Sequence, residues 1–126
     1  MHIHAVTIVV PDYDAGLAFY VNVLGFEKRA DTDMGDGKRW VMVAPPGGQT
    51  AILLAKASGQ DQTAAIGQQT GGRVGFFLMS GDFAADHARM TAAGVTFEEA
   101  PRHEAYGSVA VWRDPFGNRW DLLQLT

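Results

Sequence analysis

Apolar and polar positions change their spacing several times along the chain, and the first change separates a strand from a helix. Residues 3–10 are dominated by β-branched side chains, which are typical of a strand. Pro11 and Asp12 end this segment, and the Asp12 carboxylate can accept hydrogen bonds from the free N–H groups at the start of a helix. The pattern therefore predicts a strand followed by a helix that begins after Asp12.

The predicted helix has an apolar stripe and a glycine at its end. Leu17, Tyr20 and Leu24 are separated by three and four residues, so they lie on one helical face. Gly25 stands where a residue with left-handed backbone conformation commonly ends a helix, and Phe26 can pack back on that helix. Three further strands are expected before residue 58, at residues 27–32, 39–44 and 51–55.

A polar segment rich in Gln, Gly and Thr, residues 58–72, is predicted to be a linker, and after it the pattern repeats. Asp82 is a second candidate helix cap, and Gly94 is a second glycine at a helix end. Phe83 and Met90, seven residues apart, give this helix its apolar face. Strands are expected on both sides of it, at residues 73–79, 95–98, 108–112 and 119–125.

The two halves match in the order and spacing of their elements. Asp12 to Gly25 spans 13 positions, and Asp82 to Gly94 spans 12. Each half has one strand, one helix and three strands, which predicts an α+β fold of two tandem βαβββ modules. We assign module one to residues 1–57, the linker to 58–72 and module two to 73–126, within a single domain. A lone module leaves one sheet face open to water, so we expect curved mixed sheets around a shared cleft, with the helices outside.

Composition narrows the classes of function. Hydrophobic residues make up 47% of the 126 residues and charged residues 19%, which suits one packed core. The net charge of −4 and the lack of a basic run argue against a nucleic-acid partner. The chain has no cysteine, which excludes disulfides, thiolate nucleophiles and Cys-based metal sites. The sequence has neither a signal-peptide pattern nor a membrane-spanning run, so we expect a cytoplasmic protein without a membrane partner.

Two segments resemble the signatures of a known superfamily. Residues 12–26, DYDAGLAFYVNVLGF, resemble its "D…FY…LGF" pattern, and residues 114–122, DPFGNRWDL, resemble its "DPxGNxxEL" hairpin. Pro115 and Gly117 favour a tight turn in the second motif. Both motifs occur in order, within a two-fold repeat that covers nearly the whole chain. The sequence thus resembles the vicinal-oxygen-chelate superfamily, which contains glyoxalases, bleomycin-resistance proteins and extradiol dioxygenases.

The resemblance implies paired βαβββ modules, a concave site at the centre of the sheets and frequent dimers, so we expect a homodimer. Members of the superfamily include metal-dependent isomerases, dioxygenases and thiol transferases. Others are metal-free proteins that sequester antibiotics. Membership therefore does not by itself decide between an enzyme and a binding protein.

The metal ligands that the resemblance implies are mostly missing from this sequence. Metal-using members place His, Glu or Gln ligands on the first and last strand of each module, where a divalent ion acts as a Lewis acid. The matching first-strand positions hold Ala5 and Arg73, and residues 40–60 contain no His, Asp or Glu. Asp121 alone can bind an ion, and one ligand does not make a site, so we expect no metal and no cofactor. A one-residue register shift that turns His4 toward the cleft is the alternative.

Arg73 and Asp121 occupy two of these ligand positions in module two. The superfamily's sheet order places the first and last strands of a module side by side, so we expect an ion pair between the two side chains. Such a pair is either an inert replacement for the ion or an anchor for an anionic or carbonyl-bearing ligand. These alternatives are left open by the sequence.

Other candidate site residues are aromatic, apolar or titratable. His103 and Glu104 precede Tyr106 on a loop before the seventh predicted strand, where a binding cleft often takes its specificity. With Asp121 they are the candidate acid–base groups. The candidate ligand-binding residues, which suit a flat hydrophobic ligand, are Trp40, Met42, Arg73, Phe77, Tyr106, Trp112 and Asp121.

These residues and motifs support two functions. The first is a metal-free, small-molecule-binding protein of the bleomycin-resistance type that holds a hydrophobic or aromatic ligand in the intermodule cleft. The alternative is a glyoxalase-like lyase or isomerase, or a dioxygenase, which uses either an unexpected set of metal ligands or acid–base catalysis by His103, Glu104 or Asp121.

Overall fold

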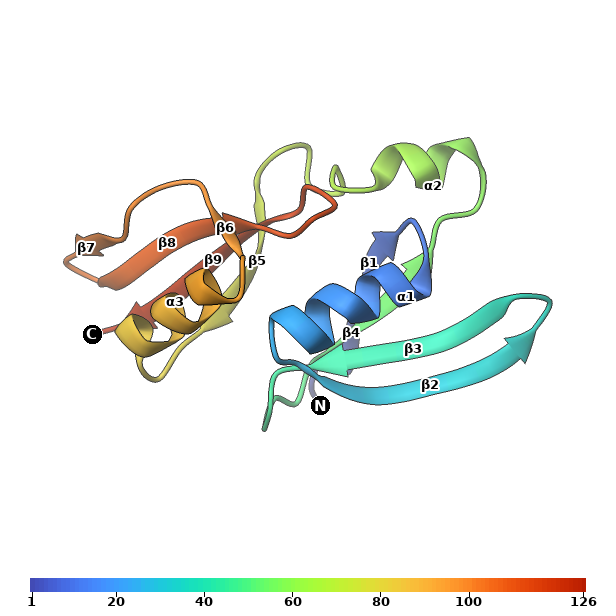
Figure 1. Cartoon of the computed structure of the whole chain (residues 1–126), viewed down its shortest axis with the longest axis horizontal. Helices are drawn as coiled ribbons and strands as arrows, with labels where there is room; N and C mark the ends of the chain where they lie inside the picture. The colour runs from blue at the N-terminus through green and yellow to red at the C-terminus, as the bar shows by residue number, and fades with distance from the viewer. The chain divides into compact units, whose positions relative to one another are not determined.

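The computed structural model describes residues 1–126, which form two compact units, residues 1–66 and 67–126 (Figure 1). The elements of the first unit are β1 (Ala5–Val10), α1 (Tyr13–Leu17), η1 (Ala18–Val23), β2 (Glu27–Gly35), β3 (Lys38–Ala44), β4 (Ala51–Lys56) and α2 (Gly59–Ala65). Those of the second unit are β5 (Val74–Met79), α3 (Phe83–Ala92), β6 (Thr96–Phe97), β7 (Arg102–Glu104), β8 (Gly107–Arg113) and β9 (Arg119–Leu125).

The two sheets have the same strand order. The first sheet runs β1-β4-β3-β2 and the second runs β5-β9-β8-β6, with β7 also paired to β8. In both sheets the first and last strands are parallel neighbours, and the other pairs are antiparallel. This shared order confirms the predicted α+β fold of tandem βαβββ modules.

In the first unit, one face of the sheet is covered by α1, which packs on β4, β1 and β3 (Figure 1). Ile8, Val10, Val41 and Leu54 are buried on this face. Gly16 allows the close approach, because a Cβ at this position would lie 2.9 Å from the Leu54 side chain. Side chains alternate along β3, so Trp40 and Met42 project from the face opposite to Val41. We call this opposite face the helix-free face of the first sheet.

The helix of module one begins at the predicted cap and contains a change of hydrogen bonding. The Asp12 carboxylate accepts a hydrogen bond from the Ala15 N–H at 2.7 Å. In η1 the bonds span five residues, as from the Leu24 N–H to the Phe19 carbonyl, which absorbs one additional residue. This explains why Asp12 to Gly25 is one position longer than the matching segment of module two.

The second sheet carries α3 on one face, with Phe83 and Met90 of the helix buried. The predicted cap is present, since Asp82 accepts a hydrogen bond from the Ala85 N–H at 3.1 Å. Gly94 has a φ of 96°, and the Val95 N–H next to it donates to the carbonyl of Met90. These bonds close the helix end as the sequence predicts.

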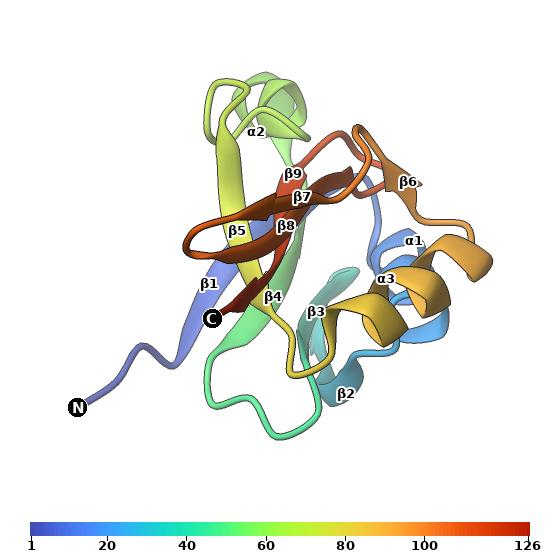
Figure 2. The same cartoon turned by 90° about the vertical axis from the view of Figure 1, so that its left-hand side faces the viewer.

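Two elements differ from the sequence prediction. The loop expected before the seventh strand contains β7, which forms a hairpin arm with β8 (Figure 2). Pro101, which has no N–H to donate, separates β7 from β6 along the same edge of β8. The expected linker contains α2, in which Gln62 accepts a hydrogen bond from the Ser58 N–H.

No helix of the chain has the length and apolar character that a membrane crossing requires.

Candidate functional site

A groove opens in the first unit where β3 and β4 part. The two strands pair only from Val41–Leu54 to Val43–Ile52. Beyond Val41, β3 continues beside β2 as far as Lys38, and beyond Leu54, β4 continues beside β1 as far as Lys56. The sheet therefore divides into two strand pairs at this end, and the space between them is the groove.

The groove has a volume of about 580 Å³ and is open to solvent. Its walls come from the ends of β3 and β4, the β2–β3 turn, α1 and α2. The lining residues are Tyr13, Asp36, Gly37, Lys38, Arg39, Trp40, Leu53, Leu54, Ala55, Lys56, Ala57, Ser58 and Gln62. We call this set the β3–β4 groove.

Trp40 is the one large aromatic side chain of the groove with a substantial exposed surface. It is 43% exposed, although indole is among the side chains that gain most from burial. Alternation along β3 places it on the helix-free face, and Leu53 and Ala55 add apolar surface beside it. A flat apolar ligand can stack on the Trp40 ring and displace water from these side chains.

Arg39 forms a rigid wall on the other side of the groove. Its guanidinium donates to both carboxylate oxygens of Asp31, at 3.0 and 2.8 Å, and to Asp14 at 2.9 Å. It also lies 5.3 Å above the centre of the Tyr13 ring. The hydrogen bonds from Arg39 hold the pKa of Asp31 below its usual value. Arg39 is therefore engaged by protein groups and fixes the β2–β3 hairpin to α1.

Asp121 lies on the face of the second sheet opposite α3, which we call the helix-free face of that sheet. It is the register partner of Phe77 on β5 and of Val111 on β8. Its Oδ1 atom is buried and accepts no hydrogen bond. Burial raises the pKa of Asp121, and Glu99 adds to this, while Arg102 acts in the opposite direction.

The structure brings Glu104 and Asp121 to the same face, but not His103. Arg102 and Glu104 pair with Val109 and Gly107, which project from the helix-free face. Arg102 donates to Glu99 at 2.9 Å and to Glu104 at 3.2 Å. His103 pairs with Ser108, which alternates with Gly107 and Val109 along β8, so His103 projects from the opposite face of the second sheet.

The His103 Nδ1 atom lies 2.9 Å from the Ser108 Oγ atom. The β7–β8 register that brings these two side chains together is set by a hairpin that the sequence did not predict. The pair lies on an exposed arm, and Tyr106 in the turn of the same arm is 51% exposed. Neither His103 nor Tyr106 lines the β3–β4 groove.

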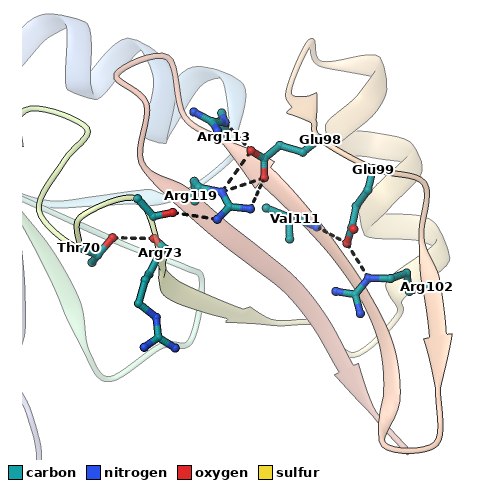
Figure 3. Close-up of polar contacts among 9 residues, drawn as sticks. Thr70, Arg73, Glu98, Glu99, Arg102, Val111, Arg113 and Arg119 are labelled. Atoms are coloured by element: carbon teal, nitrogen blue, oxygen red, sulfur yellow. Dashed lines mark hydrogen bonds and ion pairs between the residues drawn. The ribbon is translucent and has the colours of Figure 1, made fainter.

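The expected ion pair between Arg73 and Asp121 is absent, so that expectation from the sequence is wrong. Arg73 precedes β5, and Asp121 pairs with Phe77, so the two residues are four positions, or about 13 Å, apart along the strand. The Arg73 guanidinium has no acidic partner and points away from Glu98 (Figure 3). Arg113 and Arg119 instead converge on Glu98, at 2.6 and 2.8 Å.

Three other candidates have clear positions. Trp112 is completely buried and stacks on Trp120, so it belongs to the core beneath α3 and not to a ligand site. Met42 is 5% exposed in an apolar cluster with Ala44 on the helix-free face of the first sheet. Phe77 is 64% exposed, beside Asp121.

The donor groups present do not fit the divalent ion of the metal-using superfamily members. Ala5 begins β1, and Arg73 directly precedes Val74 at the start of β5; an alkyl group and a guanidinium cation offer no ligand to a divalent ion there. His4 precedes β1 and is exposed. No group of three or more His, Cys, Asp or Glu side chains could hold a metal ion.

Comparison with known proteins gives one family. The model of the Glyoxalase/Bleomycin resistance protein/Dioxygenase superfamily matches residues 2–122. A protein from Shewanella frigidimarina (strain NCIMB 400) is 48% identical over 122 residues, covering 95% of this chain and 90% of its own.

Two solved structures are similar over nearly their whole length. UcmS2 has a TM-score of 0.84 at 31% identity and covers 98% of this chain and 97% of its own. TnmS3, described as an antibiotic binding protein from Streptomyces sp. CB03234, has a TM-score of 0.80 at 30% identity and covers 100% of this chain and 97% of its own. With the duplicated fold and the family match, these similarities show that the chain belongs to the Glyoxalase/Bleomycin resistance protein/Dioxygenase superfamily.

Proposed function

We propose that this protein binds a small, flat hydrophobic or aromatic molecule without a metal ion, and that the β3–β4 groove holds it. The observation that carries the proposal is the exposed Trp40 indole in a groove of about 580 Å³, a size typical of small-molecule sites. Leu53, Ala55 and Ala57 supply apolar surface next to it.

Two further observations support a binding role. The structural neighbour TnmS3 is described as an antibiotic binding protein, and its similarity extends over this whole chain. The side chains at the superfamily's ligand positions, such as Ala5, offer no donor set for a Lewis-acid metal.

The proposal is tested by fluorescence titration with a panel of planar polycyclic aromatic compounds. We expect at least one compound to bind saturably and to lose most of its affinity in Trp40→Ala. Met34→Ala is the matched control, because Met34 is an exposed apolar residue on the same hairpin that does not line the groove. Equal affinities in wild type and Trp40→Ala for every compound would contradict a site at this groove.

Acid–base catalysis at Asp121 is the second candidate function. It is favoured by the buried Oδ1 atom without a hydrogen bond and by the raised pKa of this carboxyl group. Turnover of a carbonyl substrate that is abolished in Asp121→Asn, with binding retained, would support catalysis. Binding of a ligand that is recovered chemically unchanged after long incubation would favour the first function.

The proposal includes a homodimer. Phe77 and Leu125 are exposed on the helix-free face of the second sheet, and Met79 lies beside them on β5. Exposed apolar side chains gathered on one sheet face are typical of a surface that another chain covers. Sedimentation velocity at micromolar concentration is expected to give twice the chain mass of 13.6 kDa, and a monomer would contradict the dimer.

A further inference from the structure

The charges around the β3–β4 groove differ from those of the rest of the chain. Three cations, Lys38, Arg39 and Lys56, line it, and Asp36 is the only carboxylate among the lining residues. The whole chain has a net charge of −4. Asp31 and Asp14 compensate the charge of Arg39, so the lysines Lys38 and Lys56 are the groups of the lining that can attract an anion.

Two of these cations have no acidic partner. Arg39 is held by Asp31 and Asp14, but neither Lys38 nor Lys56 forms an ion pair. The third lysine of the chain, Lys28, lies outside the groove and pairs with Asp31 at 3.7 Å. The unpaired lysines are therefore the two that line the groove.

The two lysines stand on opposite sides of the opening, with Trp40 beside one of them. Lys38 and Trp40 are two residues apart on β3, so they project from the same face, about 7 Å apart along the strand. Lys56 ends β4 on the other strand pair. A ring stacked on Trp40 thus has the Lys38 ammonium group at its near edge. Lys56 has the same strand parity as Leu54, so its flexible side chain lines the groove from the side that carries α1.

We infer that the ligand of the groove is a flat aromatic molecule that carries an acidic group, such as a carboxylate, phenolate or sulfonate. This inference rests on the proposed function, because it specifies the chemistry of the same ligand. Trp40 contacts the ring system, and Lys38 and Lys56 donate charge-assisted hydrogen bonds to the acidic group. The ammonium groups of Lys38 and Lys56 repel a cationic ligand, which disfavours its binding in the groove.

The test uses two probes that differ only in the acidic group: 1-anilinonaphthalene-8-sulfonate and its neutral analogue N-phenyl-1-naphthylamine. We expect the sulfonate to bind more tightly, and to lose about tenfold in affinity in Lys38→Gln or Lys56→Gln, with binding that weakens as salt is added. The neutral probe should bind equally well to wild type and both variants. Lys28→Gln is the matched control and should leave both affinities unchanged.

The possible failures are distinguishable. If both probes bind equally and the lysine variants change neither affinity, while Trp40→Ala weakens both, the acidic-group inference is wrong and the proposed groove stands. If Trp40→Ala changes neither probe, the groove itself is not the binding site, and both proposals are overturned.

Discussion

Trp112 and Trp120 stack on each other with ring centroids 4.9 Å apart and ring planes 18° from parallel. They are cross-strand partners on β8 and β9, and both are almost completely buried beneath α3. The third tryptophan, Trp40, is 43% exposed at the β3–β4 groove. The indoles of this protein therefore report on two places, the core of the second unit and the groove of the first.

This division predicts how the fluorescence of the protein responds to acrylamide. A quencher in water reaches Trp40 but not the stacked pair, so Trp40→Phe should remove most of the quenchable emission and leave a blue-shifted, protected remainder. Stern–Volmer plots of wild type and Trp40→Phe measure this. Equal quenching of the two proteins would place the exposed indole elsewhere.

Asp121→Asn is expected to raise the free energy of unfolding at pH 7.5 by about 1 kcal/mol, because it removes a charge whose buried oxygen has no hydrogen-bond partner. Burial raises the pKa of Asp121, so the protonated form is favoured in the folded protein. The stability that this gives is fully present below the unfolded pKa of about 3.9 and is lost as pH rises through the folded pKa. The advantage of Asn over Asp should therefore vanish near pH 3.5 in urea unfolding.

Glu98→Gln provides the opposite pH dependence as a control. Hydrogen bonds from Arg119, and then from Arg113, lower the pKa of Glu98. The ionised Glu98 carboxylate stabilises the folded state at pH values above its pKa in the unfolded chain, and this stabilisation is lost as the pH falls through the lowered pKa of the folded state. Glu98→Gln should therefore lower the free energy of unfolding at pH 7.5, and its stability should approach that of wild type in acid. The same pH trend in both variants would contradict these assignments.

Gly94→Ala is expected to destabilise the second unit by about 1 to 2 kcal/mol, since its φ of 96° is unfavourable for a residue with a Cβ. Gly81→Ala is the matched control, because a Cβ there meets open space and no positive φ is required. Chemical unfolding that gives the two variants the same stability would show that the helix end tolerates alanine.

Divalent ions are expected to leave the midpoint of thermal unfolding unchanged. A ligand that binds the folded state at 100 times its dissociation constant stabilises by about 2.7 kcal/mol, which a thermal shift assay detects easily. Ni²⁺, Co²⁺, Zn²⁺ and Fe²⁺ should each give no such rise. A rise that disappears in Asp121→Ala would show a metal site that the donor groups do not suggest.

The sequence predicted the features that depend on local signals. Asp12 and Asp82 cap helices because a carboxylate directly before an apolar helical stripe has few other roles. Gly25 and Gly94 both adopt positive φ at the helix ends. The repeat of these signals was sufficient to predict two βαβββ modules.

Features that depend on register could not be predicted. The pairing of Asp121 with Phe77, and the irregularity between Val74 and Phe76, place Arg73 far from Asp121. The face that Trp112 occupies follows from its pairing with Trp120, which no periodicity in β8 reveals.

The groove is also a tertiary feature, because it exists only where β3 separates from β4 while each keeps its other neighbour. Trp40 was identified as a candidate from its residue type and strand. Lys38 and Lys56 were not, because isolated lysines at strand ends are common on any surface. Their distinguishing property is the lack of acidic partners, which requires the structure.

The most direct test of ligand binding at the groove is the NMR spectrum of the three indole N–H groups during titration with 1-anilinonaphthalene-8-sulfonate. Assignment by Trp40→Phe identifies the groove resonance. We predict that the Trp40 cross-peak shifts saturably and gives the same dissociation constant as the fluorescence of the probe. The cross-peaks of the buried Trp112 and Trp120 should move little. Saturation of the probe's fluorescence without a shift at Trp40, or with the main shifts at Trp112 and Trp120, would contradict binding at the β3–β4 groove.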